Sequence, residues 1–83
     1  MPLGDKLIKK LEKPFPANIR IDEDFKGNDI SIFTNGEGEA INFYIGKRKE
    51  DGNIKGEHYV RKILKDDTGK IIKSHWDNKG KVG

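Results

Sequence analysis

The sequence predicts an α+β fold in which one N-terminal helix packs on a four- to five-stranded antiparallel β-meander. Three observations support this prediction: a helical apolar stripe near the start, an apolar alternation of period two through the rest, and turn signals between the alternating runs. Eleven isoleucines against four leucines favour strands, because β-branched side chains suit a pleated sheet. With 83 residues the chain holds one domain at most, which we place at residues 1–77, followed by a flexible tail over 78–83.

The helix is expected over about ten residues at the N-terminus. Its apolar positions recur at near-helical spacing: Leu3, Leu7, Ile8 and Leu11. Asp5 favours the N-terminal end of the helix dipole. Pro14 and Pro16 end the segment, because proline lacks the amide hydrogen and restricts the residue before it to extended conformations.

After Pro16 the apolar period changes to two. Alternation is clear over residues 19–21, 30–32 and 41–45, and residues 57–65 and 70–77 are rich in strand formers. Four turn signals separate these runs: Lys26-Gly27-Asn28, Asn35-Gly36, Asp51-Gly52 and Asp67-Thr68-Gly69. Successive strands joined by short turns predict a meander.

Hairpin loops fix the register, and the register decides which side chains share a face. Asp51-Gly52, as a two-residue loop, places Phe43 opposite Val60 and Ile45 opposite His58. A three-residue loop over 67–69 then places Val60 opposite Trp76, which makes this tryptophan part of the core.

These registers predict a covered face beneath the helix and an open face on the other side. The covered face collects Ile30, Ile32, Ile41, Phe43, Ile45, Val60, Leu64, Ile72 and Trp76. The open face collects Asn42, Tyr44, Arg48, Tyr59, Arg61, Ile63, Ile71, Lys73, His75 and Asp77.

Basic residues concentrate in the second half of the chain. The formal net charge is +3, but residues 1–43 carry six basic and eight acidic side chains, whereas residues 44–83 carry eleven basic and six acidic ones. A basic half is typical of a protein that binds a polyanion, although solubility alone also favours a lysine-rich surface.

The leading hypothesis is a small basic binding module that contacts RNA or another polyanion through the open face, without a cofactor. Tyr44 and Tyr59 would stack on bases, while Arg48, Arg61 and Lys73 would neutralise phosphates. The alternative interpretation of these side chains is ordinary cross-strand pairing.

A second hypothesis is a metal-independent endoribonuclease of the toxin type. Such an enzyme needs a proton acceptor, a proton donor and cations around the reacting phosphate. His75, with Arg61 and Lys73 in support, is the candidate set. The predicted register leaves His58 on the covered face, so a two-histidine site would require a slip of one residue in a hairpin.

A third hypothesis is a protein-interaction domain of a phage or accessory protein. A protein partner or a second copy would pair with an edge strand, and residues 18–22 and 70–77 are the expected edges. The three hypotheses differ in their expected response to salt, in cleavage of RNA and in self-association.

Several classes of site and location are excluded or disfavoured. The chain has no cysteine, so it forms no disulfide and no cysteine-ligated zinc or iron–sulfur site. No apolar run approaches the roughly 20 residues of a membrane span, and the start lacks the pattern of a signal peptide. We therefore expect a cytoplasmic protein with no membrane contact and no metal.

Overall fold

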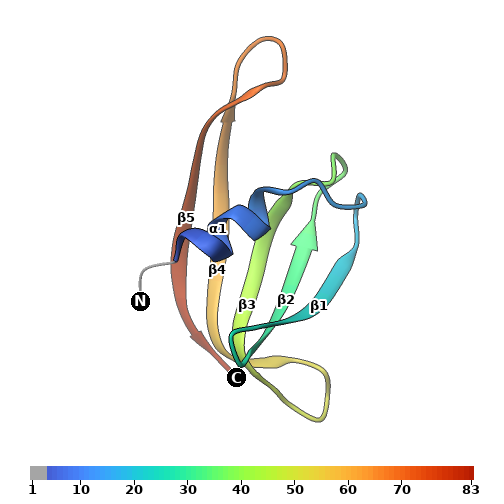
Figure 1. Ribbon diagram of the computed structural model, residues 1–83, viewed down its shortest axis with the longest axis vertical. Coiled ribbons are helices and arrows are strands. Elements are labelled where there is room, and N and C mark those ends of the chain that lie inside the picture. The colour runs from blue at the N-terminus through green and yellow to red at the C-terminus, as the bar shows by residue number, and fades with distance from the viewer. Residues whose placement is uncertain (1–3) are drawn as a thin grey trace.

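The computed structural model describes residues 4–83 (Figure 1). One short helix, α1 (Asp5–Glu12), precedes five strands. The strands are β1 (Arg20–Phe25), β2 (Asn28–Thr34), β3 (Ala40–Arg48), β4 (Ile54–Lys65) and β5 (Ile71–Val82). They form one antiparallel sheet in the order β1-β2-β3-β4-β5. The predicted helix followed by an antiparallel meander is therefore confirmed, and the fold is mostly β.

Helix α1 ends at Glu12, because the next residue, Lys13, is extended and precedes Pro14. Lys13 has φ −69° and ψ 150°, the extended conformation that a following proline imposes. Leu7 and Leu11 are buried, whereas Leu3 of the predicted stripe lies outside the described residues. Within residues 4–83, no helix has the length and apolar content needed to cross a bilayer.

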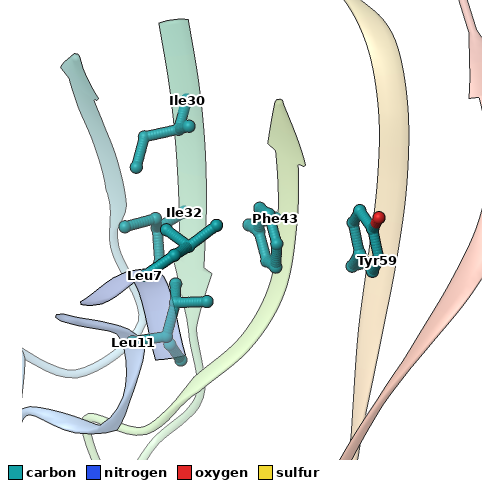
Figure 2. Close-up of a cluster of buried hydrophobic side chains, with 7 residues drawn as sticks. Leu7, Leu11, Ile30, Ile32, Phe43 and Tyr59 are labelled. Carbon is teal, nitrogen blue, oxygen red and sulfur yellow. The ribbon is translucent and has the colours of Figure 1, made fainter. Parts of the chain in front are cut away.

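One buried cluster joins the helix to the covered face of the sheet (Figure 2). Its largest members are Leu7, Leu11, Ile30, Ile32, Phe43 and Tyr59. The Phe43 ring stacks on Tyr59, with centroids 4.9 Å apart, and meets Trp76 edge-on at 5.0 Å. Aromatic pairs in these geometries add about 0.5–1.5 kcal/mol beyond the burial of their area.

Three hairpins share one turn geometry. In each, the amide of a glycine donates to the carbonyl of the residue three positions earlier. The amide of that earlier residue donates in turn to the carbonyl of the residue that follows the glycine. The glycines are Gly38, Gly52 and Gly69, at φ +77°, +88° and +86°. The prediction is confirmed for the loop over 67–69. It is wrong for Asp51-Gly52, which belongs to a three-residue loop over 50–52 rather than a two-residue one.

The longer loop shifts β4 by one residue against β3. Phe43 pairs with Tyr59, and Tyr44 pairs with His58. Because side chains alternate between faces, this shift places Tyr59 and Arg61 on the covered side and His58 on the open face. The predicted placement of Tyr59 and Arg61 on the open face is therefore wrong, and the Tyr59 side chain is only 3% exposed.

A β-bulge at Ile72 produces a second shift, between β4 and β5. Lys65 pairs with Ile71, as the loop predicts, but Leu64 then pairs with Lys73. The two shifts cancel for β5, so Trp76 stays on the covered side and His75 stays on the open face. Three predicted core residues lose their place: Val60 pairs with Asn42 on the open face, Leu64 is 52% exposed and Ile72 is 54% exposed.

Strand β5 also continues through the predicted flexible tail. Gly80 pairs with His58 and Val82 pairs with Gly56. The sequence gives no apolar pattern there, because these residues are held by backbone pairing rather than by burial. Asn78 adds side-chain bonds to the Gly80 amide, at 2.7 Å, and to the Tyr59 hydroxyl, at 3.3 Å. The expected tail over 78–83 is therefore corrected to a strand that ends at Val82.

The two long hairpins lie at opposite ends of the sheet (Figure 1). We call residues 47–55, which comprise the end of β3, the loop and the start of β4, the hairpin tip. We call residues 61–74, which comprise the end of β4, the loop and the start of β5, the arm. The strands below the hairpin tip cross at a facing pair of glycines, Gly46 and Gly56. A Cβ on Gly46 would lie 2.1 Å from the Lys55 carbonyl oxygen. Only a residue without a side chain permits this approach, which lets the hairpin tip fold toward β1.

Candidate nucleic-acid interface

Three rings lie side by side on the open face, one each from β2, β3 and β4. Phe33 meets Tyr44 edge-on, with centroids 5.9 Å apart and planes at 78°. Tyr44 stacks on His58 at 4.2 Å, with planes at 5°. On β1, the guanidinium carbon of Arg20 lies 5.8 Å from the Phe33 ring centroid. We call these four residues the aromatic row, and it crosses four of the five strands.

His58 occupies the place on the open face that the sequence assigned to Tyr59. Its Nε2 lies 2.5 Å from Oδ1 of Asn42, a contact in which the ring nitrogen donates. Burial, and secondarily the charge of Lys79, lower the pKa of His58 below its ordinary value. The imidazole is therefore neutral near pH 7, and a neutral planar ring stacks on Tyr44 without a desolvated charge.

Arg48 lies on the open face as predicted, but its donors are occupied. They reach Ser31 Oγ at 3.0 Å, the Gly52 carbonyl at 3.1 Å and the Ile30 carbonyl at 3.2 Å. The same guanidinium lies 3.4 Å from Oδ1 of Asp22. These contacts join the hairpin tip to β1 and β2, so Arg48 holds the hairpin tip against the open face of the sheet.

Asp22 is the carboxylate that both arginines, Arg20 and Arg48, contact. Its Oδ1 accepts from Ser31 Oγ at 2.7 Å and from Arg20 Nε at 2.9 Å. Burial raises the pKa of Asp22, but the hydrogen bonds from Ser31 and Arg20 and the charges of Arg20 and Arg48 outweigh it. The net pKa lies below the ordinary value, so the carboxylate remains ionised and continues to hold both arginines.

A cavity of about 360 Å³ lies between the aromatic row and the hairpin tip. Phe33 and Tyr44 form part of its wall, together with the aliphatic side chains of Ile54 and Val82. The cavity forms because the glycine pair folds the hairpin tip over the open face. The sequence pattern gave no indication of it.

The predicted catalytic set is divided between the two faces. His75 is on the open face of β5, just beyond the arm, where its Nε2 lies 2.7 Å from Oδ1 of Asp77, and Lys73 is exposed nearby on the same strand. Arg61 lies on the covered side, with Nε 2.6 Å from Ser74 Oγ and its guanidinium 5.7 Å from the Trp76 ring centroid. The structure therefore does not bring Arg61 together with His75 and Lys73.

The two histidines share the open face but not one site. His75 pairs with Lys62, which lies four residues along β4 from His58. Four strand residues span about 13 Å, well beyond hydrogen-bonding reach. Within residues 4–83, no three histidine, aspartate or glutamate side chains gather where they would hold a metal ion.

Comparison of the chain with known protein families, with curated proteins and with solved structures found no match. The function is therefore argued from side-chain geometry and charge.

Sequence reasoning missed three members of the aromatic row: Arg20, Phe33 and His58. One signal for Phe33 was present, because this aromatic residue occupies a polar position in the alternation around Ile30 and Ile32. The position of His58 depended on the loop length before β4, which the Asp-Gly signal alone does not determine. Arg20 stood in an alternating run that looked like an ordinary edge strand.

Proposed function

We propose that the protein is a small binding module for single-stranded nucleic acid, RNA in the first instance, which it contacts through the open face. The observation that carries this proposal is the aromatic row, in which three rings and one guanidinium follow each other across the sheet. Sheet surfaces of this kind hold unpaired bases by stacking, which contributes about 1–3 kcal/mol per base.

The ends of the row are the places where a base would stack. Tyr44 and His58 each cover one face of the other ring, so those two faces are not accessible to a base. An incoming base would instead stack at the end of the pair and continue it. At the β5 end His58 pairs with Gly80, and even a Cβ there would meet nothing within 4 Å among the described residues. A base would therefore stack beside His58 above Gly80.

Cations near this end supply the electrostatic part of the binding. Lys79 is exposed and close enough to His58 to affect its pKa. Lys62, four residues further along β4, is also exposed, although it pairs with Asp77 at 3.4 Å. They belong to the half of the chain with eleven basic and six acidic residues. Phosphates bound to such lysines release counterions, which makes the affinity depend steeply on salt.

The test is fluorescence anisotropy of a labelled mixed-sequence single-stranded RNA at about 20 mM and about 150 mM salt. We expect affinity to fall by at least tenfold between the two, as it does when several phosphates are contacted. Tyr44→Ala removes the ring that holds His58 in the stack and should weaken binding by about tenfold, the contribution of one stacked base. Salt-independent binding, or no binding at low salt, would contradict the proposal.

Two lysines provide a matched control for the position of the interface. Lys79→Gln removes a charge from the open face and should lower the salt slope by about one. Lys9→Gln removes the same charge from the exposed side of α1 and should leave both affinity and slope unchanged. Equal effects of the two variants would mean that the attraction is diffuse and has no interface on the open face.

The same samples separate the other two hypotheses. RNA recovered on a denaturing gel should be intact, whereas cut RNA that His75→Ala leaves whole would favour the endoribonuclease. Sedimentation of the protein alone should show a monomer. A dimer that forms at low concentration and ignores RNA would favour the protein-interaction domain instead.

A further inference from the structure

We propose that the cavity between Phe33, Tyr44 and the hairpin tip binds one nucleotide, with its base on the two rings and its phosphate at Lys49. This proposal rests on the proposed function in so far as the occupant is a unit of the same single strand. The pocket is nevertheless defined by its own walls and is testable with a free mononucleotide.

The size and walls of the cavity suit one planar aromatic group. Its volume of about 360 Å³ lies near the lower end of the range for small-ligand pockets, about 300–1,000 Å³. Phe33 and Tyr44 stand at 78° to each other and so form a corner. A planar base that stacks on one ring meets the other edge-on, and both arrangements are favourable for aromatic groups. Ile54 and Val82 add apolar contacts on the remaining walls.

The charged side chains of the lining favour an anionic ligand. Among the described residues, Arg20 and Lys49 are the charged side chains that line the cavity and both are basic, although Arg20 pairs with Asp22; Gly83, the last residue of the sequence, also lines it. An aromatic group joined to an anion fits walls of this chemistry, and a nucleoside monophosphate has both parts.

The two cations have different roles. Arg20 is fixed, because its guanidinium bonds Asp22 at 2.9 Å and the Gly52 carbonyl at 2.5 Å. Lys49 is 41% exposed, and its contact with Asp51 spans 4.0 Å. An exposed ion pair of this length contributes little, so Lys49 can turn to a phosphate at small cost. Arg20 therefore shapes the wall and Lys49 binds the phosphate.

The pocket is formed before a ligand arrives. Arg48 and Arg20 both donate to the Gly52 carbonyl, which holds the hairpin tip over Ser31. Ser31 itself is 2% exposed and fully engaged with Asp22 and the arginines. A preformed pocket avoids the ordering cost of a mobile loop, so even a single nucleotide can bind detectably.

The experiment is an NMR titration of the full chain with adenosine 5′-monophosphate, observing backbone amides. Saturable shifts at Ser31, Asn53 and Ile54 are expected, whereas inorganic phosphate at the same concentration should leave them unmoved. Lys49→Gln should weaken the nucleotide by about fivefold, as for one exposed ion pair, and leave adenosine unchanged. Lys47→Gln is the matched control, because Lys47 lies in the same hairpin tip and donates to the Gly27 carbonyl at 2.8 Å instead.

The outcomes distinguish this proposal from the proposed function. If single-stranded RNA binds and shifts His58 and Gly80 but the nucleotide moves no pocket amide, the pocket proposal is overturned and the RNA module stands. If the nucleotide shifts the pocket amides and RNA does not bind, the pocket stands as a small-ligand site and the RNA module falls. Equal weakening by Lys47→Gln and Lys49→Gln would also overturn the phosphate assignment.

Discussion

The hairpin tip and the arm begin with the same turn and end in different environments. Each is closed by a left-handed glycine, Gly52 or Gly69, with identical backbone bonding. The hairpin tip folds back over the open face, where Ile54 is only 4% exposed, whereas the arm projects from the sheet with Leu64 and Ile72 more than half exposed. The turn therefore sets the register of a hairpin, and its direction is set by the strands below it.

Two features at the base of the hairpin tip account for the difference. The facing glycines Gly46 and Gly56 permit a backbone approach that no side chain would allow. Arg48 then supplies donors to Ser31 and to the Gly52 carbonyl, which fix the folded position. The arm carries neither feature, and its side-chain ties to β3 and the loop before it are the hydrogen bond from Arg61 to the Ala40 carbonyl and the ion pair of Lys65 with the carboxylates of Glu37 and Glu39.

The largest effect is expected from a methyl group at the glycine pair. Gly46→Ala would place its Cβ 2.1 Å from the Lys55 carbonyl oxygen, so the strands must separate. We expect the free energy of unfolding to fall by about 3 kcal/mol, measured by urea denaturation. Gly69→Ala in the arm meets no atom within 4 Å and should cost about 1 kcal/mol for its backbone conformation alone. Equal losses at the two sites would contradict the role given to the glycine pair.

A smaller effect on stability is expected from removing the Arg48 guanidinium. Arg48→Met leaves the buried Ser31 hydroxyl and the Ile30 carbonyl short of a donor, which should lower the free energy of unfolding by about 2 kcal/mol. Lys73→Met is the control on the arm, where the side chain is exposed, and should change stability by less than about 0.5 kcal/mol. Chemical denaturation measures both variants. A neutral Arg48→Met would show that the hairpin tip stays folded without it.

The smallest effect is expected from titrating His58, which lies between the two regions. Because its pKa is lowered in the folded state, the unfolded chain takes up the proton first as the pH falls. The melting temperature should therefore be highest above the ordinary pKa of 6.5 and decrease slightly as the pH falls below it. His58→Asn should remove this decrease, while His75→Asn, which retains His58, should keep it. If the wild-type protein and His58→Asn showed the same change in melting temperature between about pH 7.5 and about pH 5.5, the burial of His58 against Tyr44 would be contradicted.

Most of the fold was predictable because its signals are local. Proline ended the helix, alternation marked the strands, and each Gly-containing turn was visible in the sequence. Registers were less predictable, since Asp51-Gly52 suits either a two- or a three-residue loop. The spacing Asn35-x-x-Gly38 and Asp66-x-x-Gly69 recurs as Lys49-x-x-Gly52, but a lysine at the first position hides the common turn. The bulge at Ile72 left no sequence signal.

The candidate site was predicted only in part for the same reason. Tyr44 and His75 were placed on the correct face, the latter because two one-residue shifts cancelled. Tyr59 and Arg61 lie on β4, after the first shift and before the second, so only one shift affects them and they were assigned to the wrong face. The cavity depends on the hairpin tip folding back, which is a long-range event that a strand-by-strand argument does not reach.

The long outer strand of the meander bears on solubility. β5 is an edge strand of twelve residues, and its outer side presents unpaired backbone groups that another chain would join to form an aggregate. Two bulges, at Ile72 and Lys79, interrupt that side, and Lys73, Lys79 and Lys81 place like charges along it. An incoming copy of the same strand would meet broken spacing and mutual repulsion. The irregularities that shifted the register thus also protect the chain from edge-to-edge aggregation, and high salt should weaken the electrostatic part of that protection.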